Sequence, residues 1–270
     1  MAEQTGGRCA NGASLGCWQV QIRVLGAMML REIHARYGRS NVGFLWLIIE
    51  PLLLASVITL LHSVTMGHSE GGMQPYPFTV IGYCFVIIFR NNFSRSESAL
   101  TSNPSVLYHA QVTPTDIVLA RMTADTFGII VAFLVLLGGG ILFDLAQWPA
   151  RPLYLFLAAA EITVWTFGLS MATAAYCVKY HVLGRLVHPI AYFMFPLSGA
   201  FFTLDFLPFW AREYMAWNPL MLMFETARYG QFQSASAHYI DHAYVILNCA
   251  ISLFLGLLAV RRVRPFIHVH

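Results

Sequence analysis

Six long apolar stretches recur along the chain, and short segments that carry most of the charged residues separate them. At 1.5 Å per helical residue, each stretch is long enough to cross about 30 Å of hydrocarbon. Apolar runs of this length are typical of membrane-spanning helices, because a helix on the surface of a soluble protein keeps one polar face. The pattern predicts six transmembrane helices at residues 42–66, 76–93, 117–143, 153–178, 183–202 and 244–260.

A different pattern precedes the first predicted span. One apolar stripe recurs every three or four residues, at Trp18, Ile22, Leu25, Met29 and Ile33. This stripe predicts an amphipathic helix at residues 18–36 that lies at the membrane interface. Residues 1–17 are rich in Gly, Ala and Ser, and we expect them to be disordered.

The segment between the fifth and sixth stretches is apolar and aromatic, but Asn218-Pro219 interrupts it. Proline suits the first position of a helix, so the segment predicts two half-helices, at residues 207–217 and 219–232. We expect this pair to enter the outer half of the membrane as a re-entrant hairpin. The break between its two helices should be buried or face water, since lipid cannot satisfy an irregular backbone.

Two polar segments are expected on the opposite side of the membrane. Residues 94–116 contain an Asn103-Pro104 break, and Thr113-Pro114 is a helix-start signal. Residues 179–184 predict a tight turn between the fourth and fifth spans.

Composition and charge fit this topology, since 57% of the residues are hydrophobic and 11% are charged, against about 25% charged in a soluble domain. Thirteen of the sixteen Lys and Arg residues fall on one side, namely Arg8, Arg23, Arg31, Arg36, Arg39, Arg90, Arg95, Arg121, Lys179, Arg185, Arg261, Arg262 and Arg264. The other side carries Arg151, Arg212 and Arg228. The positive-inside rule then predicts that both termini are cytoplasmic.

A few charged residues fall within or beside the apolar stretches. Glu50, which precedes Pro51 in the first span, suits either a structural ion pair near the membrane surface or a carboxylate that lines a path. Glu161 in the fourth span suits either a hydrogen bond in helix packing or a place in such a lining. Arg121 and Asp125 are four residues apart and predict an ion pair on one helix face.

The sequence predicts neither a catalytic site nor a metal site. Its single lysine, Lys179, does not follow the glycine pattern of a phosphate-binding loop, and no hydrolase motif occurs. His238 and His242 are four residues apart but lack a third ligand, so a solvated outer turn is the stronger interpretation. The five cysteines are scattered without a paired framework and predict free core thiols.

Two motifs accompany this topology: Arg36-Tyr37-(x)5-Gly43-(x)2-Trp46-(x)4-Pro51, and Asn218-Pro219-Leu220-(x)7-Arg228. With them the chain resembles the membrane permease subunit of type-2 ABC exporters, and most closely the KpsM-type permeases that export capsular polysaccharide. The resemblance implies an all-α, six-span permease domain at residues 37–264 in the bacterial inner membrane. It also implies a homodimeric channel for a lipid-linked polysaccharide.

The resemblance further implies partners for the chain. A cytoplasmic ABC ATPase subunit, in two copies, would bind ATP and Mg²⁺, and this chain would hold no cofactor of its own. A periplasmic adaptor and an outer-membrane polysaccharide exporter would complete the route.

Residue roles follow from the resemblance and from the tendency of sugar rings to stack on aromatic side chains. The expected ATPase-coupling residues are Arg23, Arg31, Arg95, Glu97, Tyr108, Lys179 and His181. The expected channel and gate residues are Arg36, Tyr37, Arg39, Glu50, Tyr83, Tyr192, Phe193, Trp210, Tyr214, Asn218, Pro219 and Arg228.

Other interpretations stay open. An ABC permease of this kind could carry another cargo, such as O-antigen, teichoic acid, a drug or a lipid. The chain could instead be a proton-coupled carrier, for which Glu161 is the available deep acid, although no internal repeat is evident. A membrane-embedded enzyme ranks last, because the chain lacks a nucleophile–base or metal set.

Overall fold

The part of the chain that the structure describes is entirely helical. This computed structural model describes residues 13–37, 46, 49, 52–58, 60–61, 72–102 and 113–267. The elements are α1 (Ala13–Tyr37), α3 (Pro75–Ser96), α5 (Pro114–Leu142), α6 (Pro152–Lys179), α7 (His181–Leu197), the 3₁₀ turn η2 (Leu204–Phe206), α8 (Phe209–Met215), α9 (Pro219–Gln231) and α10 (His242–Ile267). The prediction of an all-α protein is confirmed for these residues.

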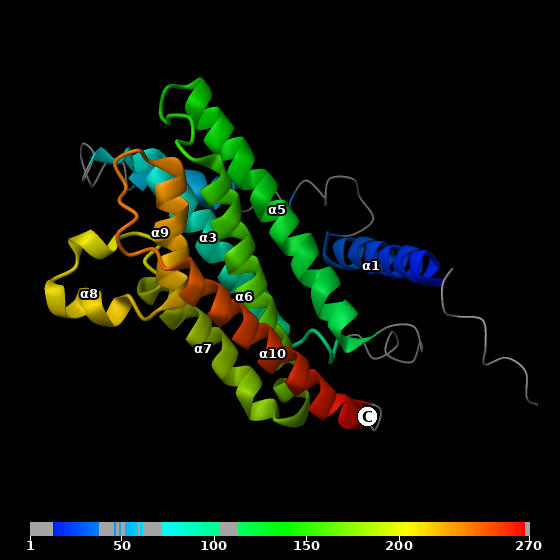
Figure 1. The fold of residues 1–270 in the computed structure, drawn as a ribbon. Coiled ribbons are helices and arrows are strands. Elements are labelled where there is room, and N and C mark those ends of the chain that lie inside the picture. The colour runs from blue at the N-terminus through cyan, green and yellow to red at the C-terminus, as the bar shows by residue number, and fades with distance from the viewer. Residues whose placement is uncertain are drawn as a thin grey trace, which may run out of the picture.

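The long helices run back and forth between two ends of one bundle (Figure 1). At one end, the α1 end, α3, α6 and α10 finish, α5 begins, and α1 packs across α5. At the other, the α9 end, α3, α6 and α10 begin, α5 finishes, and α9 packs against α6, while α8 stands to one side of the bundle. The chain therefore brings segments that are distant in sequence together at each end.

Large apolar side chains lie on the outside of the bundle as well as in its core. Leu134 on α5, Phe156 on α6 and Phe254 on α10 are 50%, 64% and 65% exposed. Among the described residues, α5, α6 and α10 are long and apolar enough to cross a membrane. An apolar exterior on such helices fits contact with lipid rather than with water.

The predicted spans match the helices unequally. The spans expected at 117–143, 153–178 and 244–260 coincide with the three helices that could cross a membrane. The span expected at 76–93 coincides with α3, whereas the one expected at 183–202 is helical only as far as Leu197, where α7 ends.

Other boundaries follow from local signals or differ from expectation. Gly199 takes a φ of +77° just beyond α7, a conformation that turns the chain away from the helix axis and suits glycine. Thr113 caps α5 and forms a reciprocal capping box with Asp116, which confirms the predicted helix start. Helix α1 begins at Ala13, before the expected residue 18. Most of the first predicted span lies outside the described residues, but residues 52–58 are helical.

Helices α6 and α10 approach each other closely because small residues face across their interface. Gly168 on α6 lies against the backbone of Ser252, and Gly256 on α10 lies against the Gly168 carbonyl. A methyl group added at either glycine would collide with the backbone of the opposite helix. Small residues allow backbones to pack in this way in membrane helix bundles.

Helix α9 is short but is buried on almost every side. Its residues 220–228 are all buried, including two charged ones, Glu225 at 8% exposed and Arg228 at 1%. The Arg228 guanidinium donates to Glu225 Oε1 at 3.2 Å and to the Gly199 carbonyl, and it lies 4.4 Å from the centre of the Phe78 ring. Glu225 Oε1 also accepts from the Leu204 amide at 3.0 Å. These contacts fix α9 against α3 and the link after α7.

We predict that Gly168→Ala lowers the thermal stability of the protein in detergent, because the added methyl pushes α6 and α10 apart. The added methyl should lower the free energy of unfolding by about 1–3 kcal/mol, the usual cost of overpacking a well-packed interior. Thermal unfolding followed by tryptophan fluorescence measures the change. Gly138→Ala is the matched control: nothing lies within 4 Å of a Cβ at Gly138, and alanine favours helix. Equal stability of the two variants would contradict the close packing.

We predict that Arg228→Met destabilises the protein by about 3–5 kcal/mol, because it leaves the Glu225 carboxylate buried without its cation. Combining it with Glu225→Gln should recover most of the loss, since the pair is then neutral. Melting temperatures of both single variants and the double variant give the coupling between the two residues. Arg261→Met removes an exposed arginine and should change little. A double variant that loses as much stability as the two single variants together would refute the coupling.

Candidate functional site

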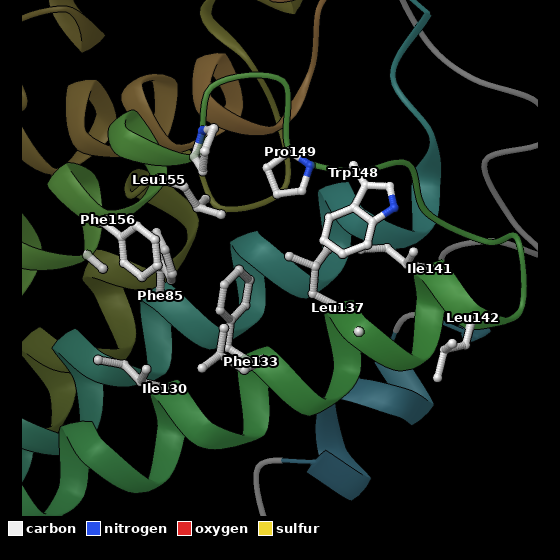
Figure 2. Close-up of a pocket in the computed structure, with 14 residues that line it drawn as sticks. Phe85, Ile130, Phe133, Leu137, Ile141, Leu142, Trp148, Pro149, Leu155 and Phe156 are labelled. Carbon is white, nitrogen blue, oxygen red and sulfur yellow. The ribbon is translucent and has the colours of Figure 1, made fainter.

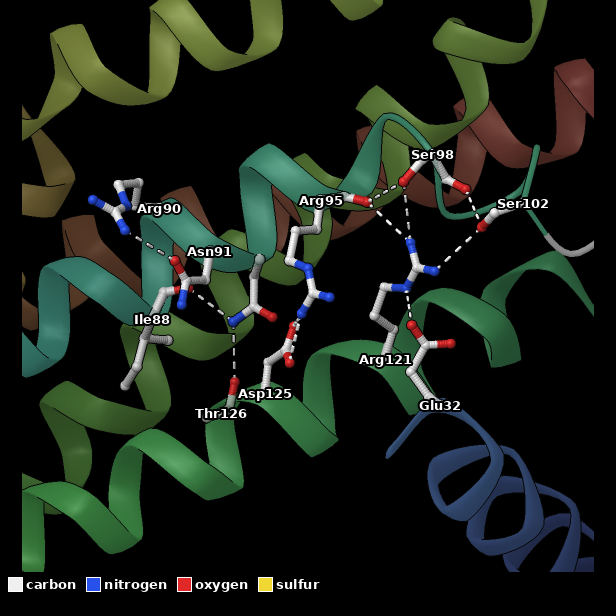
Figure 3. A network of polar contacts seen from close by, with 11 residues as sticks. Glu32, Ile88, Arg90, Asn91, Arg95, Ser98, Ser102, Arg121, Asp125 and Thr126 are labelled. Atoms are coloured by element: carbon white, nitrogen blue, oxygen red, sulfur yellow. Dashed lines mark hydrogen bonds and ion pairs between the residues drawn. The ribbon is translucent and has the colours of Figure 1, made fainter. Parts of the chain in front are cut away.

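A polar network joins three helices at the α1 end of the bundle (Figure 3). Arg95 on α3 donates to both carboxylate oxygens of Asp125 on α5, at 2.9 and 2.6 Å. Arg121, one turn earlier on α5, donates its Nε to Glu32 of α1 at 2.7 Å and its Nη1 to the Arg95 carbonyl at 3.2 Å. We call these four side chains the α1-end network. It ties α1 to the middle of the bundle through charge-assisted hydrogen bonds.

This geometry corrects the expected role of Arg121 and Asp125. The sequence predicted an ion pair between them along one face of α5. In the structure their hydrogen bonds instead reach other helices, Asp125 to Arg95 and Arg121 to Glu32. These longer-range bonds are possible because α1 and α3 both pack against the first turns of α5. The pair therefore serves to connect elements rather than to stabilise one helix.

Two further contacts hold α1 and α7 at the same end. Gln21 on α1 donates its Nε2 to Asp116 at 2.6 Å, next to the start of α5. His188 on α7 lies 3.3 Å from the Glu97 carboxylate just beyond α3. Leu25 and Met29 of the predicted apolar stripe pack against the bundle, whereas Ile22 of the same stripe is 65% exposed. Part of the stripe therefore packs on protein, and part stays open.

The expected ATPase-coupling residues lie mostly around this end. Arg95 belongs to the α1-end network, and Glu97 contacts His188. Arg23 and Arg31 are exposed on α1, and Lys179 is exposed at the end of α6, where its ammonium lies 5.2 Å from the Tyr180 ring centre. The backbone of His181 begins α7, but its side chain lies outside the described residues, as does Tyr108.

The expected channel and gate residues divide into exposed and buried groups. The exposed group is Tyr192, Phe193, Trp210 and Tyr214, at 62%, 69%, 68% and 75%. Tyr83 and Arg228 are buried inside the protomer, at 4% and 1%, so neither lies on a surface of the described chain. The side chains of Arg36 and Tyr37, together with Arg39 and Glu50, lie outside the described residues.

Asn218 and Pro219 occupy the break between α8 and α9. Two helices flank this break, as predicted, and Pro219 is the first residue of the second. Asn218 Oδ1 accepts from the Leu220 amide at 3.1 Å, and its Nδ2 donates to the Leu197 carbonyl at 2.9 Å. The Asn218 side chain therefore caps α9 and joins it to the end of α7.

The sequence predicted no site role for two arginines at the α9 end, Arg151 and Arg212. Each is an isolated cation in an apolar or aromatic stretch. Arg212 on α8 donates to the Leu204 carbonyl at 3.0 Å and to the Tyr239 hydroxyl at 2.8 Å. Arg151, before α6, donates to the carbonyls of Tyr229 and Phe232 at 3.1 and 3.3 Å. Both arginines donate to backbone carbonyls at the ends of short helices or just beyond them, where carbonyls lack a full set of helical partners.

Glu161 on α6 and His242 on α10 contact each other where the two helices pack. They are not part of an open surface. Glu161 is 5% exposed, and its Oε1 lies 3.6 Å from His242 Nδ1. Neither Glu161 carboxylate oxygen has a hydrogen-bond partner among the described residues. The Tyr154 ring lies 5.7 Å from the His242 ring. The burial of the Glu161 side chain places it in helix packing within the described chain.

An apolar cavity of about 580 Å³ lies between α5 and α6 near the α9 end (Figure 2). Phe133 and Leu137 line it from α5, Phe85 from α3 and Phe156 from α6, while Trp148 lies in the connecting loop. Among the described residues, no charged side chain lines this cavity. Such a lining suits hydrocarbon groups rather than a hydroxylated polymer.

Comparisons with known proteins agree with this arrangement of apolar helices. The ABC-2 type transporter family matches residues 23–232. The capsule polysaccharide export inner-membrane protein CtrC of Neisseria meningitidis serogroup A is 32% identical over 243 residues, which cover 90% of this chain and 92% of CtrC. BexB of Haemophilus influenzae, which carries the same description, is 28% identical over 90% of this chain and 91% of its own length. The polysialic acid transport protein KpsM of Escherichia coli is 22% identical over 89% and 93%. The chain belongs to the ABC-2 type transporter family.

Proposed function

We propose that this chain is the inner-membrane permease of an ATP-driven exporter of lipid-linked capsular polysaccharide. Two copies would form the channel, each with six spans, and a separate ATPase subunit would supply the energy. The observation that carries the proposal is the similarity to CtrC and BexB along nine tenths of the chain, since both are described as capsule polysaccharide export inner-membrane proteins.

The distribution of charge supports an orientation for the bundle. Arg95, Arg121 and Lys179 lie at the α1 end, together with Arg261 and Arg262 near the end of α10. The α9 end holds Arg151, Arg212 and Arg228 among the described residues. The positive-inside rule therefore favours a cytoplasmic α1 end and an outer α9 end. A periplasmic adaptor and an outer-membrane exporter would then receive the polymer at the α9 end.

The α1-end network is suited to carry movement of an ATPase subunit into the membrane helices. Helix α1 lies across the bundle and presents Arg23 and Arg31, which are exposed. Its Glu32 is bonded to Arg121, which in turn bonds the backbone at the end of α3. A displacement of α1 would therefore pull on α5 and α3 together.

The exposed aromatic residues support a role for α7 and α8 in contact with the polymer. Sugar rings stack through their C–H faces on aromatic rings, and a long polymer can slide over several similar weak sites. Tyr192 and Phe193 on α7 and Trp210 and Tyr214 on α8 are all more than half exposed. In a homodimer these helices would line the path, and the α8–α9 pair would form an outer, re-entrant gate.

We predict that bacteria without this chain make capsular polysaccharide but retain it inside the cell, because the polymer has no route across the inner membrane. Quantifying polymer on intact and on lysed cells with a capsule-specific stain or antibody measures the loss. The gene returned on a plasmid should restore surface polymer. Unchanged surface polymer in the deletion strain would overturn the capsule assignment and direct the test to O-antigen, teichoic acid, drug or lipid cargo.

The energy source is tested in the strain that carries the gene on the plasmid. Export should stop when the partner ATPase is inactivated and continue when the proton gradient alone is dissipated. Export that follows the proton gradient instead would favour a coupled carrier over an ABC permease.

We predict that Arg121→Glu reduces export about tenfold or more while the chain still reaches the membrane. A hydrogen bond to a charged group contributes about 1.5–3 kcal/mol, and about 1.4 kcal/mol is a tenfold change in an equilibrium. The charge exchange Glu32→Arg with Arg121→Glu should restore most of the export. Surface polymer and co-purification of the ATPase subunit are the two measurements.

Thr123→Ala is the control for this network. Thr123 is exposed on the same helix, and its hydroxyl bonds only the Leu119 carbonyl of α5 among the contacts of the described chain. It should export normally. If Arg121→Glu also exports normally, the α1-end network does not transmit the ATPase cycle.

A further inference from the structure

A second cavity, polar and of about 220 Å³, opens at the α9 end of the bundle. Three segments that are distant in sequence surround it: the start of α3, the loop between α5 and α6, and the end of α9. Its lining includes Gln74, Gln147, Gln231, Phe232, Gln233 and Ser234. We call it the glutamine cavity. None of the described residues that line it is charged.

The walls of the glutamine cavity are joined by hydrogen bonds between its own residues. Gln74 Oε1 accepts from the Gln147 amide at 3.1 Å, which joins the start of α3 to the α5–α6 loop. Gln231 Nε2 donates to the Gln147 carbonyl at 2.8 Å, which joins the end of α9 to the same loop. The cavity is therefore held open by a built polar frame rather than left by loose packing.

Backbone hydrogen bonds also join the α5–α6 loop to the end of α9. The Ala150 amide donates to the Gln231 carbonyl at 3.2 Å, and the Arg151 amide donates to the Gly230 carbonyl at 2.7 Å. The Arg151 guanidinium also lies 4.0 Å from the centre of the Tyr229 ring. The α5–α6 loop and the end of α9 thus form one rigid corner.

One buried acceptor in this lining has no partner. The Gln231 side chain is 3% exposed, and its Oε1 accepts no hydrogen bond among the described residues. A buried acceptor without a donor costs about 1–3 kcal/mol, so Gln231 Oε1 calls for a partner that the described residues do not supply. The NH₂ of the same amide already donates to the Gln147 carbonyl. Because Oε1 is sealed from solvent, a hydroxyl donor in the cavity would reach it once the Gln231 side chain turns toward the cavity that it lines.

The chemistry of the lining selects among ligand classes. Glutamine side chains offer both donors and acceptors, and a sugar hydroxyl is likewise both. Phe232 adds an aromatic surface beside them, against which the C–H face of a ring can pack. None of the described residues that line the cavity is cationic, and the nearby Arg151 guanidinium already donates to the Tyr229 and Phe232 carbonyls. A carboxylate bound here would lose its water without gaining a cation, so an anionic ligand is disfavoured relative to a neutral one.

We infer that the glutamine cavity is a subsite for one neutral sugar residue of the exported polymer at the outer face of the permease. The inference rests on the proposed function, which assigns the α9 end to the outer face and a polysaccharide to the channel. The bound sugar would occupy the corner formed by the α5–α6 loop and the end of α9. Repeated capture and release there would resist backward sliding of the chain.

The test uses the full chain in lipid nanodiscs and two defined probes. Saturation-transfer NMR measures binding of cellotetraose, which is neutral, and of tetragalacturonate, which is acidic and of the same length. Cellotetraose should bind measurably, and tetragalacturonate at least tenfold more weakly. The double variant Gln233→Ala with Ser234→Ala removes two exposed polar groups from the rim and should weaken cellotetraose binding at least tenfold.

Ser236→Ala and Gln19→Ala are the matched controls, because both residues are exposed and neither lines the cavity. Both should bind cellotetraose as the unmodified chain does. Equal binding by the rim variant, or equal binding of the two probes, would overturn the subsite. Normal capsule export by a chain that binds neither probe would refute the subsite and leave the proposed function standing. Loss of the gene without loss of export would refute both.

Discussion

A guanidinium buried in an apolar helix bundle must find its partners within the protein, and Arg228 shows what this requirement imposes. It bonds Glu225 on its own helix and the Gly199 carbonyl beyond α7, and it lies over the ring of Phe78 on α3. None of these partners can be exchanged for water, because Arg228 is only 1% exposed. One cation therefore helps to fix α9 relative to α3 and to the link after α7. The rest of the α9 end is built on that helix.

The two ends of α9 carry different features that share this support. At its start, Asn218 caps the helix and bonds the Leu197 carbonyl, so the break before α9 is joined to the end of α7. At its end, Gln231 bonds the Gln147 carbonyl and lines the glutamine cavity. Helix α8 adds exposed aromatic rings on one side. A gate and a sugar subsite on a single rigid helix would keep a constant spacing during export.

Local signals in the sequence predicted the helices, but they did not predict which side chains of different helices bond to each other. Thr113-Pro114 and Asn218-Pro219 marked helix starts correctly because capping chemistry acts within one turn. Arg121 was assigned a partner four residues away, but its Nε bonds Glu32, 89 positions distant, since tertiary packing of α1 on α5 decides that contact. The glutamine cavity left no periodic signal, because its residues come from three separate segments. The expected roles in coupling and gating stay predictions.

Helix α3 connects the two ends of the bundle, which bears on how movement at the α1 end could reach the α9 end. It begins next to Gln74 at the glutamine cavity and carries Arg95 of the α1-end network in its last turn. Its 22 residues span about 33 Å at 1.5 Å per residue. Residues 77–89 are buried without interruption, so the helix is packed on all sides over that length. Close-packed helices move as rigid bodies rather than deform continuously. A pull on Arg95 from α1 and α5 would therefore shift Gln74 as well, and the cavity frame would register the state of the α1 end.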